Sequence, residues 1–222
     1  MRVVIAGGHG KIALRLERLL AGRGDEAVGL VRRAEHEPDL RAAGATAVLC
    51  DLEKAGADEV AAHLAGADAV VFAAGAGPGS GVARKDTVDR AASALLAEAA
   101  ERAGVRRFVQ VSSMGAGSPP AAGSDEVWAA YITAKTRAEE DLRARDLDWV
   151  ILRPGALTDD PGTGRVTLAV PPLPFGRVTR DDVAAVIAEL LDAPGVTGAV
   201  LELVGGEASV ADAVRNLSAA GR

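Results

Sequence analysis

The sequence predicts an α/β fold in which helices wind on both faces of a parallel sheet, a doubly wound arrangement. Short apolar runs alternate with longer amphipathic stretches over most of the 222 residues, as is typical of such a sheet. The length, and an apolar content of 49%, suit a single domain covering residues 1–222. The expected strands, in chain order, are Val3–Ala6, Ala27–Val31, Ala45–Cys50, Ala69–Ala73, Phe108–Ser112, Trp149–Leu152 and Val200–Leu203.

Helices are expected between these strands. The clearest are Ile12–Ala21, Val88–Ala103, a long one from about Asp125 to Arg145, and Arg180–Asp192. Gly104 is suited to end the second of these helices, and Thr179 or Asp181 to cap the start of the last one.

Residues 155–180 break this pattern, because they are rich in proline and glycine and too irregular for a helix. We expect a small loop region on the substrate side of the fold. A connecting excursion with a short strand near Val166 explains the same residues equally well.

The first strand runs directly into Gly7, Gly8 and Gly10 and then into a helix. Gly7 can adopt the backbone angles of a tight turn, Gly10 admits a phosphate close to the main chain, and Ala13 allows close packing of helix on strand. A helix N-terminus attracts anions. The segment therefore predicts the pyrophosphate cradle of a Rossmann fold, formed by Gly7, Gly8, His9, Gly10, Lys11 and Ile12.

The residues after the second and third strands indicate which dinucleotide binds. Arg32 and Arg33 follow the second strand, and their forked donors suit the 2′-phosphate of NADP better than the ribose hydroxyls of NAD. The alternative is a strand end with solvated arginines. After the third strand, Asp51 and Leu52 are placed at the adenine, although Asp51 could instead cap the following helix.

Small residues follow the fourth strand. Ala73, Ala74 and Gly75 would let the backbone pass under the pyrophosphate and the nicotinamide ribose. An ordinary turn at the end of a strand accounts for them almost as well.

The chain has one tyrosine, Tyr131, and one of its four lysines, Lys135, lies four residues later in a helical stretch. This spacing places both side chains on one helical face, where an ammonium group can stabilise a phenolate, so Tyr131 is a candidate general acid or base. The alternative is an ordinary surface pair. Ser112 and Ser113 end the fifth strand at the sheet edge where such folds bind ligands.

These motifs together resemble the atypical short-chain dehydrogenases/reductases of the NmrA-like kind, a group that includes biliverdin reductase B and bacterial sugar-epimerase-like proteins. The resemblance rests on GGHGKIA, VRR, DL, AAG, VSS, YITAK, LRPG and RDDVA. It implies that Ser113 orients the substrate, that Tyr131 is the acid or base, and that Lys135 binds the nicotinamide ribose. It also implies that the nicotinamide is lined by Pro154, Gly155 and Leu157.

One departure from the family concerns the proton relay, because Ala74 precedes Gly75 where many classical members carry an asparagine. The expected activity is an NADPH-dependent reduction of a small carbonyl, quinone or flavin-like acceptor. Two alternatives are a non-catalytic NADP-binding redox sensor and an NAD-dependent epimerase or isomerase of a small substrate.

Composition argues against other partners. A net charge of −6 disfavours nucleic acid, and the sequence shows neither a targeting segment nor a long apolar run, so we expect a cytoplasmic protein away from membranes. Cys50 is the only cysteine, and His9, His36 and His63 have no ligand spacing with it or with each other, so no metal site is expected. The sequence leaves open whether the protein is a monomer or a homodimer.

Overall fold

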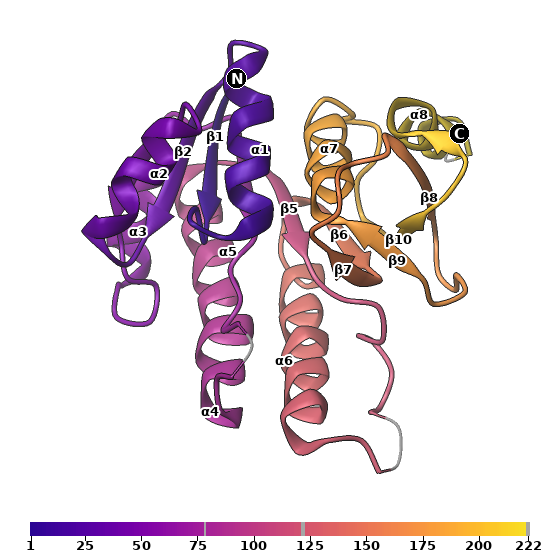
Figure 1. Ribbon diagram of the computed structural model, residues 1–222. Coiled ribbons are helices and arrows are strands. Elements are labelled where there is room, and N and C mark those ends of the chain that lie inside the picture. Colours follow the sequence, from indigo (N-terminus) through magenta and orange to yellow (C-terminus); the bar gives the residue numbers. More distant parts are fainter. Residues whose placement is uncertain (78, 121–122, 221–222) are drawn as a thin grey trace.

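A large, mostly parallel sheet organises the protein, and helices cover both of its faces (Figure 1). The computed structural model describes residues 1–77, 79–120 and 123–220. Within them nine strands follow the order β11-β8-β10-β6-β5-β4-β1-β2-β3. Their bounds are β1 Arg2–Ala6, β2 Glu26–Val31, β3 Thr46–Leu49, β4 Ala69–Phe72, β5 Arg107–Val111, β6 Asp148–Pro154, β8 Arg165–Ala169, β10 Ala199–Gly205 and β11 Ala208–Ser209.

The seven strands β1 to β6 and β10 are parallel, whereas β8 and β11 extend the sheet in antiparallel pairing. The order reverses at β1, since β2 and β4 lie on its two sides. Ligands bind at such a switch point in doubly wound sheets. Two short parallel strands, β7 (Ala156–Thr158) and β9 (Arg177–Thr179), form a separate small sheet.

The helices form two layers, each of which encloses its own core. Val3 and Ile5 of β1 face the core beneath α1 and α7, and Val4 and Ala6 face the core beneath α3 and α5. This alternation is the two-residue period of a strand buried on both faces. The helices are α1 Lys11–Gly22, α2 Glu37–Ala42, α3 Ala57–Leu64, α4 Val82–Arg84, α5 Ala92–Ala103, α6 Glu126–Arg143, α7 Arg180–Leu191 and α8 Val210–Ala220.

The structure confirms the expected fold class and corrects several details. The helix expected from Val88 begins with a π-helical segment, η2 (Lys85–Ala91), that continues into α5. A 3₁₀ turn, η1 (Ala34–His36), precedes α2. The short strand near Val166 is present as β8, but the sheet is not wholly parallel because β8 runs antiparallel to its neighbours β10 and β11. Periodicity could not reveal β7, β9 or β11, each of which has two or three residues.

Both expected helix caps are present. Gly104 has a left-handed conformation, with a φ of 72°, at the C-terminus of α5. Thr179, rather than Asp181, caps α7, since its side chain accepts a hydrogen bond from the backbone N–H of Asp182.

Glu17 lies on the inner face of α1 and is completely buried. Neither carboxyl oxygen has a hydrogen-bond partner among the described residues. The side chain is held between two glycines, because a Cβ built at Gly29 would lie 2.7 Å from Glu17 Oε1 and one at Gly8 would lie 3.1 Å from it. Burial raises the pKa of Glu17 to about 8, so the folded protein holds this carboxyl neutral at pH 7.

This burial predicts that stability falls as pH rises between about 4.5 and 8. Below this range Glu17 is protonated in both states, whereas within it the unfolded chain loses the proton that the folded chain retains. Replacing Glu17 with Gln removes this ionisable group. At pH 8 the Glu17→Gln variant should therefore have an unfolding free energy about 1–3 kcal/mol higher than the wild type, and at pH 5 the difference should be much smaller. Urea unfolding at the two pH values measures the difference.

The matched control is Glu35→Gln, since Glu35 is exposed. It should leave the pH dependence unchanged. Identical pH slopes for the wild type and Glu17→Gln would contradict the prediction.

Candidate nucleotide-binding site

The glycine-rich loop after β1 is closed tightly against the end of β4. Gly7 has a φ of 78°, and a Cβ at this residue would lie 2.6 Å from Ala74 Cα. The backbone N–H of Gly10 donates to the Gly7 carbonyl at 2.7 Å, and Gly10 is the N-cap of α1. Because glycine provides no capping side chain, the first N–H groups of α1 are left to a ligand. The loop fits a pyrophosphate that approaches the backbone closely.

A cavity of about 280 Å³ lies beside this loop. Its walls include the residues that directly follow four parallel strands. These are the glycine loop after β1, Arg32 after β2, Cys50 after β3 and Ala73 after β4. The cavity therefore lies at the carboxyl edge of the sheet and at its switch point, where doubly wound folds bind nucleotides.

Half of the residues expected to bind the cofactor line this cavity. They are Gly7, His9, Gly10, Arg32, Asp51, Leu52, Ala73, Ala74 and Gly75. The others lie outside its lining, namely Gly8, Lys11, Ile12, Arg33, Ser112, Lys135, Pro154, Gly155 and Leu157. Gly8 donates its N–H to the Leu30 carbonyl, and Ile12 is buried in the core.

Several lining residues were missed by sequence reasoning, because the fold gathers them from separate segments. They are Leu30, Val31, His36, Cys50, Glu53, Arg84, Val88 and Ala92. Leu30, Val31, Cys50 and Glu53 carried a signal, since each lies within two residues of a predicted cofactor-binding residue.

Glu53 binds two arginine side chains at one end of the cavity. Its carboxylate accepts hydrogen bonds from Arg84 at 2.6 Å, from Thr87 at 2.8 Å and from Arg32 at 3.5 Å. The Arg84 guanidinium holds the pKa of Glu53 below its usual value. Two guanidinium groups are thus held side by side where an anionic ligand could replace their carboxylate partner.

Two histidines form another part of this wall. The rings of His9 and His36 are stacked with their centroids 3.8 Å apart, and His9 Nε2 lies 2.7 Å from Asp39. Burial, and then the neighbouring His9, lowers the pKa of His36. His36 is therefore neutral at pH 7, while a bound phosphate would favour its protonated form.

The thiol of Cys50 faces the same region. Burial, and then the carboxylates of Glu59 and Asp51, raises its pKa to about 11. The thiol is accordingly protonated at neutral pH and is a poor nucleophile.

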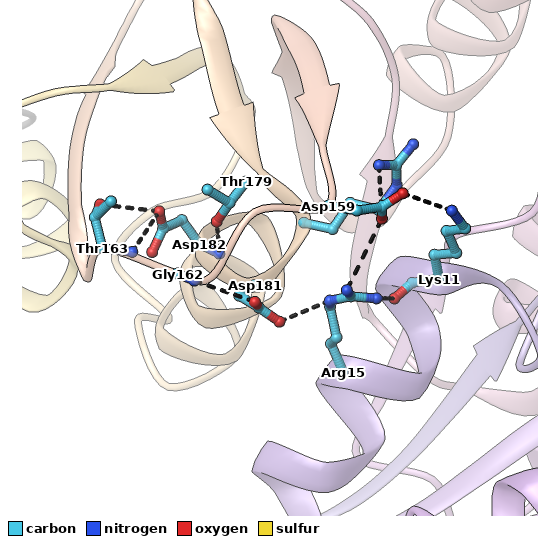
Figure 2. A network of polar contacts seen from close by, with 9 residues as sticks. Lys11, Arg15, Asp159, Gly162, Thr163, Thr179, Asp181 and Asp182 are labelled. Atoms are coloured by element: carbon cyan, nitrogen blue, oxygen red, sulfur yellow. Dashed lines mark hydrogen bonds and ion pairs between the residues drawn. The ribbon is translucent and has the colours of Figure 1, made fainter.

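A network of ion pairs joins the start of α1 to the C-terminal third of the chain (Figure 2). Lys11 Nζ lies 2.6 Å from Asp159, which also accepts from Arg180 at 2.9 Å, and Arg15 donates to Asp181 at 2.6 Å. The next residue on α7, Asp182, accepts a hydrogen bond from the backbone N–H of Thr163. The network holds the segment after β7 beside the phosphate loop, with Lys11 engaged by Asp159.

Tyr131 lies on α6, whose start is fixed by the Asp125 side chain, an acceptor for the N–H of Trp128. Two lysine ammonium groups flank its ring: Lys135 Nζ is 5.7 Å and Lys85 Nζ is 5.3 Å from the ring centroid. Both lysines are buried. The expected pairing of Tyr131 with Lys135 on one helical face is present, and Lys85, from η2, adds a second ammonium that sequence reasoning missed.

Buried polar contacts connect Lys135, which lies beside this tyrosine, to the edge of the cavity. Lys135 Nζ lies 3.2 Å from Asp89 Oδ1 and donates to the Val111 carbonyl. Asp89 in turn accepts from the N–H of Ala76, next to the cavity residue Gly75. Asp89 and Lys135 thus link the edge of the cavity to the surroundings of the Tyr131 ring.

The two serines after β5 have different environments. Ser112 is buried and donates to Glu139 at 2.6 Å, and Glu139 also binds the Arg153 guanidinium at 2.5 Å. The Ser112 hydroxyl therefore attaches α6 to the end of β5, and Arg153 attaches α6 to β6. Ser113 is only half-buried, and its hydroxyl donates to the neighbouring Met114 carbonyl at 3.2 Å, a local contact that a substrate could replace.

The cavity, the glycine loop and the strand order define a Rossmann-type nucleotide-binding protein. The chain matches the NAD(P)H-binding family over residues 7–194, and it belongs to that family. Within the described residues no helix is long and apolar enough to cross a membrane.

Individual relatives agree with this assignment. The chain is 36% identical to a protein of Bacillus subtilis named as an uncharacterised sugar epimerase, YhfK, over 98% of this chain and all of that one. It is similar to a putative NAD-dependent epimerase/dehydratase from Bacillus halodurans, with a TM-score of 0.89, 36% identity and coverage of 97% and 99% of the two chains. It is also similar to ChuY, an anaerobilin reductase from Escherichia coli O157:H7, with a TM-score of 0.77, 28% identity and coverage of 94% and 99%.

The contact between Gly7 and Ala74 predicts that Gly7→Ala abolishes NAD(P)H binding. The new methyl group would meet Ala74, and the φ of 78° disfavours alanine, so the free energy of unfolding should fall by more than about 2 kcal/mol. Fluorescence titration with NADPH and urea unfolding measure the two effects.

Gly104→Ala is the matched control, because Gly104 has a φ of 72° but open space around its Cβ position. It should cost about 1 kcal/mol through strain alone and leave binding intact. Equal binding by Gly7→Ala and the wild type would refute the assignment of the loop.

Proposed function

We propose that this protein is an NADPH-dependent reductase of a small carbonyl, quinone or flavin-like acceptor. The observation that carries the proposal is the position of Tyr131, whose ring centroid lies 5.3 Å from Lys85 Nζ and 5.7 Å from Lys135 Nζ. Lys135 is paired with Asp89, which accepts from the N–H of Ala76 at the edge of the nucleotide cavity. Membership of the NAD(P)H-binding family supports a nicotinamide nucleotide as the cofactor. A proton donor beside such a site favours reduction over simple binding.

The preference for NADP rests on the charges at one end of the cavity. Arg32 and Arg84 both line it, and both donate to the carboxylate of Glu53. A 2′-phosphate would bind these guanidinium groups, with His36 as a further donor, while Arg33 lies outside the lining. Asp51 and Leu52 would then contact the adenine.

The nicotinamide half of the cofactor would extend from the glycine loop toward α6. Ala73, Ala74 and Gly75 line this path. Pro154 and Gly155, at the end of β6, and Leu157, in β7, would form the far wall, and residues 155–180 the substrate side. The exposed Phe175, with 72% of its surface accessible, is available to cover an apolar acceptor.

When bound, the nicotinamide would supply hydride to the acceptor, and the protein would supply the proton. Ser113 gives up its contact with Met114 to hold the acceptor oxygen, and the Tyr131 hydroxyl donates its proton to that oxygen. The two ammonium groups stabilise the resulting phenolate. Asp89 holds Lys135 in place through their ion pair.

The names of the relatives support two activities. The reductase ChuY favours hydride transfer to an external acceptor, whereas the epimerase names imply a reaction without net use of cofactor. Consumption of NADPH in the presence of an acceptor distinguishes the two. A redox sensor would bind NADPH and turn over no acceptor.

The role of Arg32 predicts that Arg32→Ala weakens NADPH binding about tenfold, equivalent to about 1.4 kcal/mol, and leaves NADH binding unchanged. The readout is the fluorescence of Trp128, which is exposed and lies 5.4 Å from the Tyr131 ring. The Trp128→Phe variant identifies the background from Trp149.

The neighbouring Arg33→Ala serves as the matched control and should alter neither affinity. Equal affinity of the wild type for NADPH and NADH would contradict the assignment of a 2′-phosphate site.

The role of Tyr131 predicts that Tyr131→Phe lowers kcat with an oxygen acceptor by about 10²–10⁴-fold while NADPH affinity stays the same. The measurement is NADPH oxidation with a panel of quinones, flavins and aromatic carbonyl compounds. Thr133→Val, on another face of α6 with its hydroxyl bonded to the Ala129 carbonyl, is the control. Unchanged turnover in Tyr131→Phe would exclude the acid role, and the absence of any turnover in the wild type would favour the sensor.

A further inference from the structure

A second group of chemically reactive side chains lies behind the nucleotide cavity. Cys50, Glu59 and His63 each offer one ligand atom, and these atoms all lie within 4.8 Å of one another. Cys50 follows β3, whereas Glu59 and His63 lie one turn apart on α3. The proposed reductase chemistry uses neither Glu59 nor His63.

The geometry points to a zinc-binding site formed by Cys50 Sγ, a carboxylate oxygen of Glu59 and a ring nitrogen of His63. Zinc bound at about 2.0–2.3 Å separates tetrahedral ligand atoms by about 3.3–3.8 Å. Moderate side-chain rotation would therefore bring the three groups into coordination distance, and Glu59 is exposed and free to rotate. A water molecule would complete the tetrahedron.

The types of ligand select the metal. A thiolate with an imidazole favours zinc and related borderline ions, and disfavours magnesium and calcium, which require oxygen ligands. On binding, the ion displaces the thiol proton of Cys50, which passes to solvent, and no electron is transferred. The pair at positions 59 and 63 has the i, i+4 spacing that places two ligands on one helical face.

The fold explains why spacing along the chain did not reveal this site. Cys50 lies nine residues before Glu59, with the loop after β3 between them, and that loop also carries Asp51 and Leu52. Cys50 therefore lines the nucleotide cavity and also belongs to the cluster with Glu59 and His63. The inference extends beyond the proposed reductase function and does not depend on it.

The test uses the full chain, stripped of metal with a chelator and free of nucleotide. Titration with Co²⁺ should give a thiolate-to-metal charge-transfer band that saturates at one equivalent, and Zn²⁺ should abolish the band by displacement. Cys50→Ser should remove the band. In competition with a chromophoric chelator, His63→Gln and Glu59→Gln should each weaken Zn²⁺ binding by about tenfold or more.

His36→Gln is the matched control, since His36 lies outside the cluster, and it should bind Zn²⁺ like the wild type. Cys50→Ala provides a second thiol-free variant, and thermal unfolding verifies that each variant is folded. A Co²⁺ spectrum without a thiolate band, or Zn²⁺ affinity unchanged in folded Cys50→Ala and His63→Gln, would overturn the proposal. NADPH binding is measured separately, so failure here leaves the reductase proposal untouched.

Discussion

The close contact between the Gly7 turn and the end of β4 is the constraint on which the site depends. A Cβ added at Gly7 would lie only 2.6 Å from the Cα of Ala74, so the two segments can pack this closely only with glycine at position 7. This contact brings β1 and β4 together at the point where the strand order reverses, and it directs the start of α1 toward the cavity. The same loop lies over the buried Glu17, so the backbone that would bind phosphate also covers an unpaired carboxyl group.

Buried polar pairs attach α6 to the sheet and thereby place Tyr131. Glu139 binds Ser112, directly after β5, and Arg153 from β6, while Lys135 binds Asp89 and the Val111 carbonyl. Such contacts add little net stability, because burying the charges costs nearly as much as pairing them returns. These contacts matter more for geometry than for stability, because each one forms only when α6 lies in one register against the strands. The position of the tyrosine thus follows from polar contacts as much as from apolar packing.

Local chemistry explains which parts of the fold could be predicted. The seven central strands and four of the helices were visible because burial on both faces produces apolar runs and burial on one face produces helical periodicity. The short strands β7 and β9 have no such pattern, because pairing with each other defines them. Similarly, the sequence shows only a continuous helical stretch at η2, where the structure has π-helical turns packed against α6.

By itself, the sequence determined the glycine loop, the arginine after β2 and the pairing of Tyr131 with Lys135, since each depends on residues adjacent in the chain or one helical turn apart. Only the tertiary structure decided that Arg84 joins Arg32 at Glu53, that Lys85 faces Tyr131, and that Cys50 meets His63. These groups lie on different elements, and their meeting depends on how helices pack on the sheet. That packing is a property of the whole chain, which local spacing does not encode.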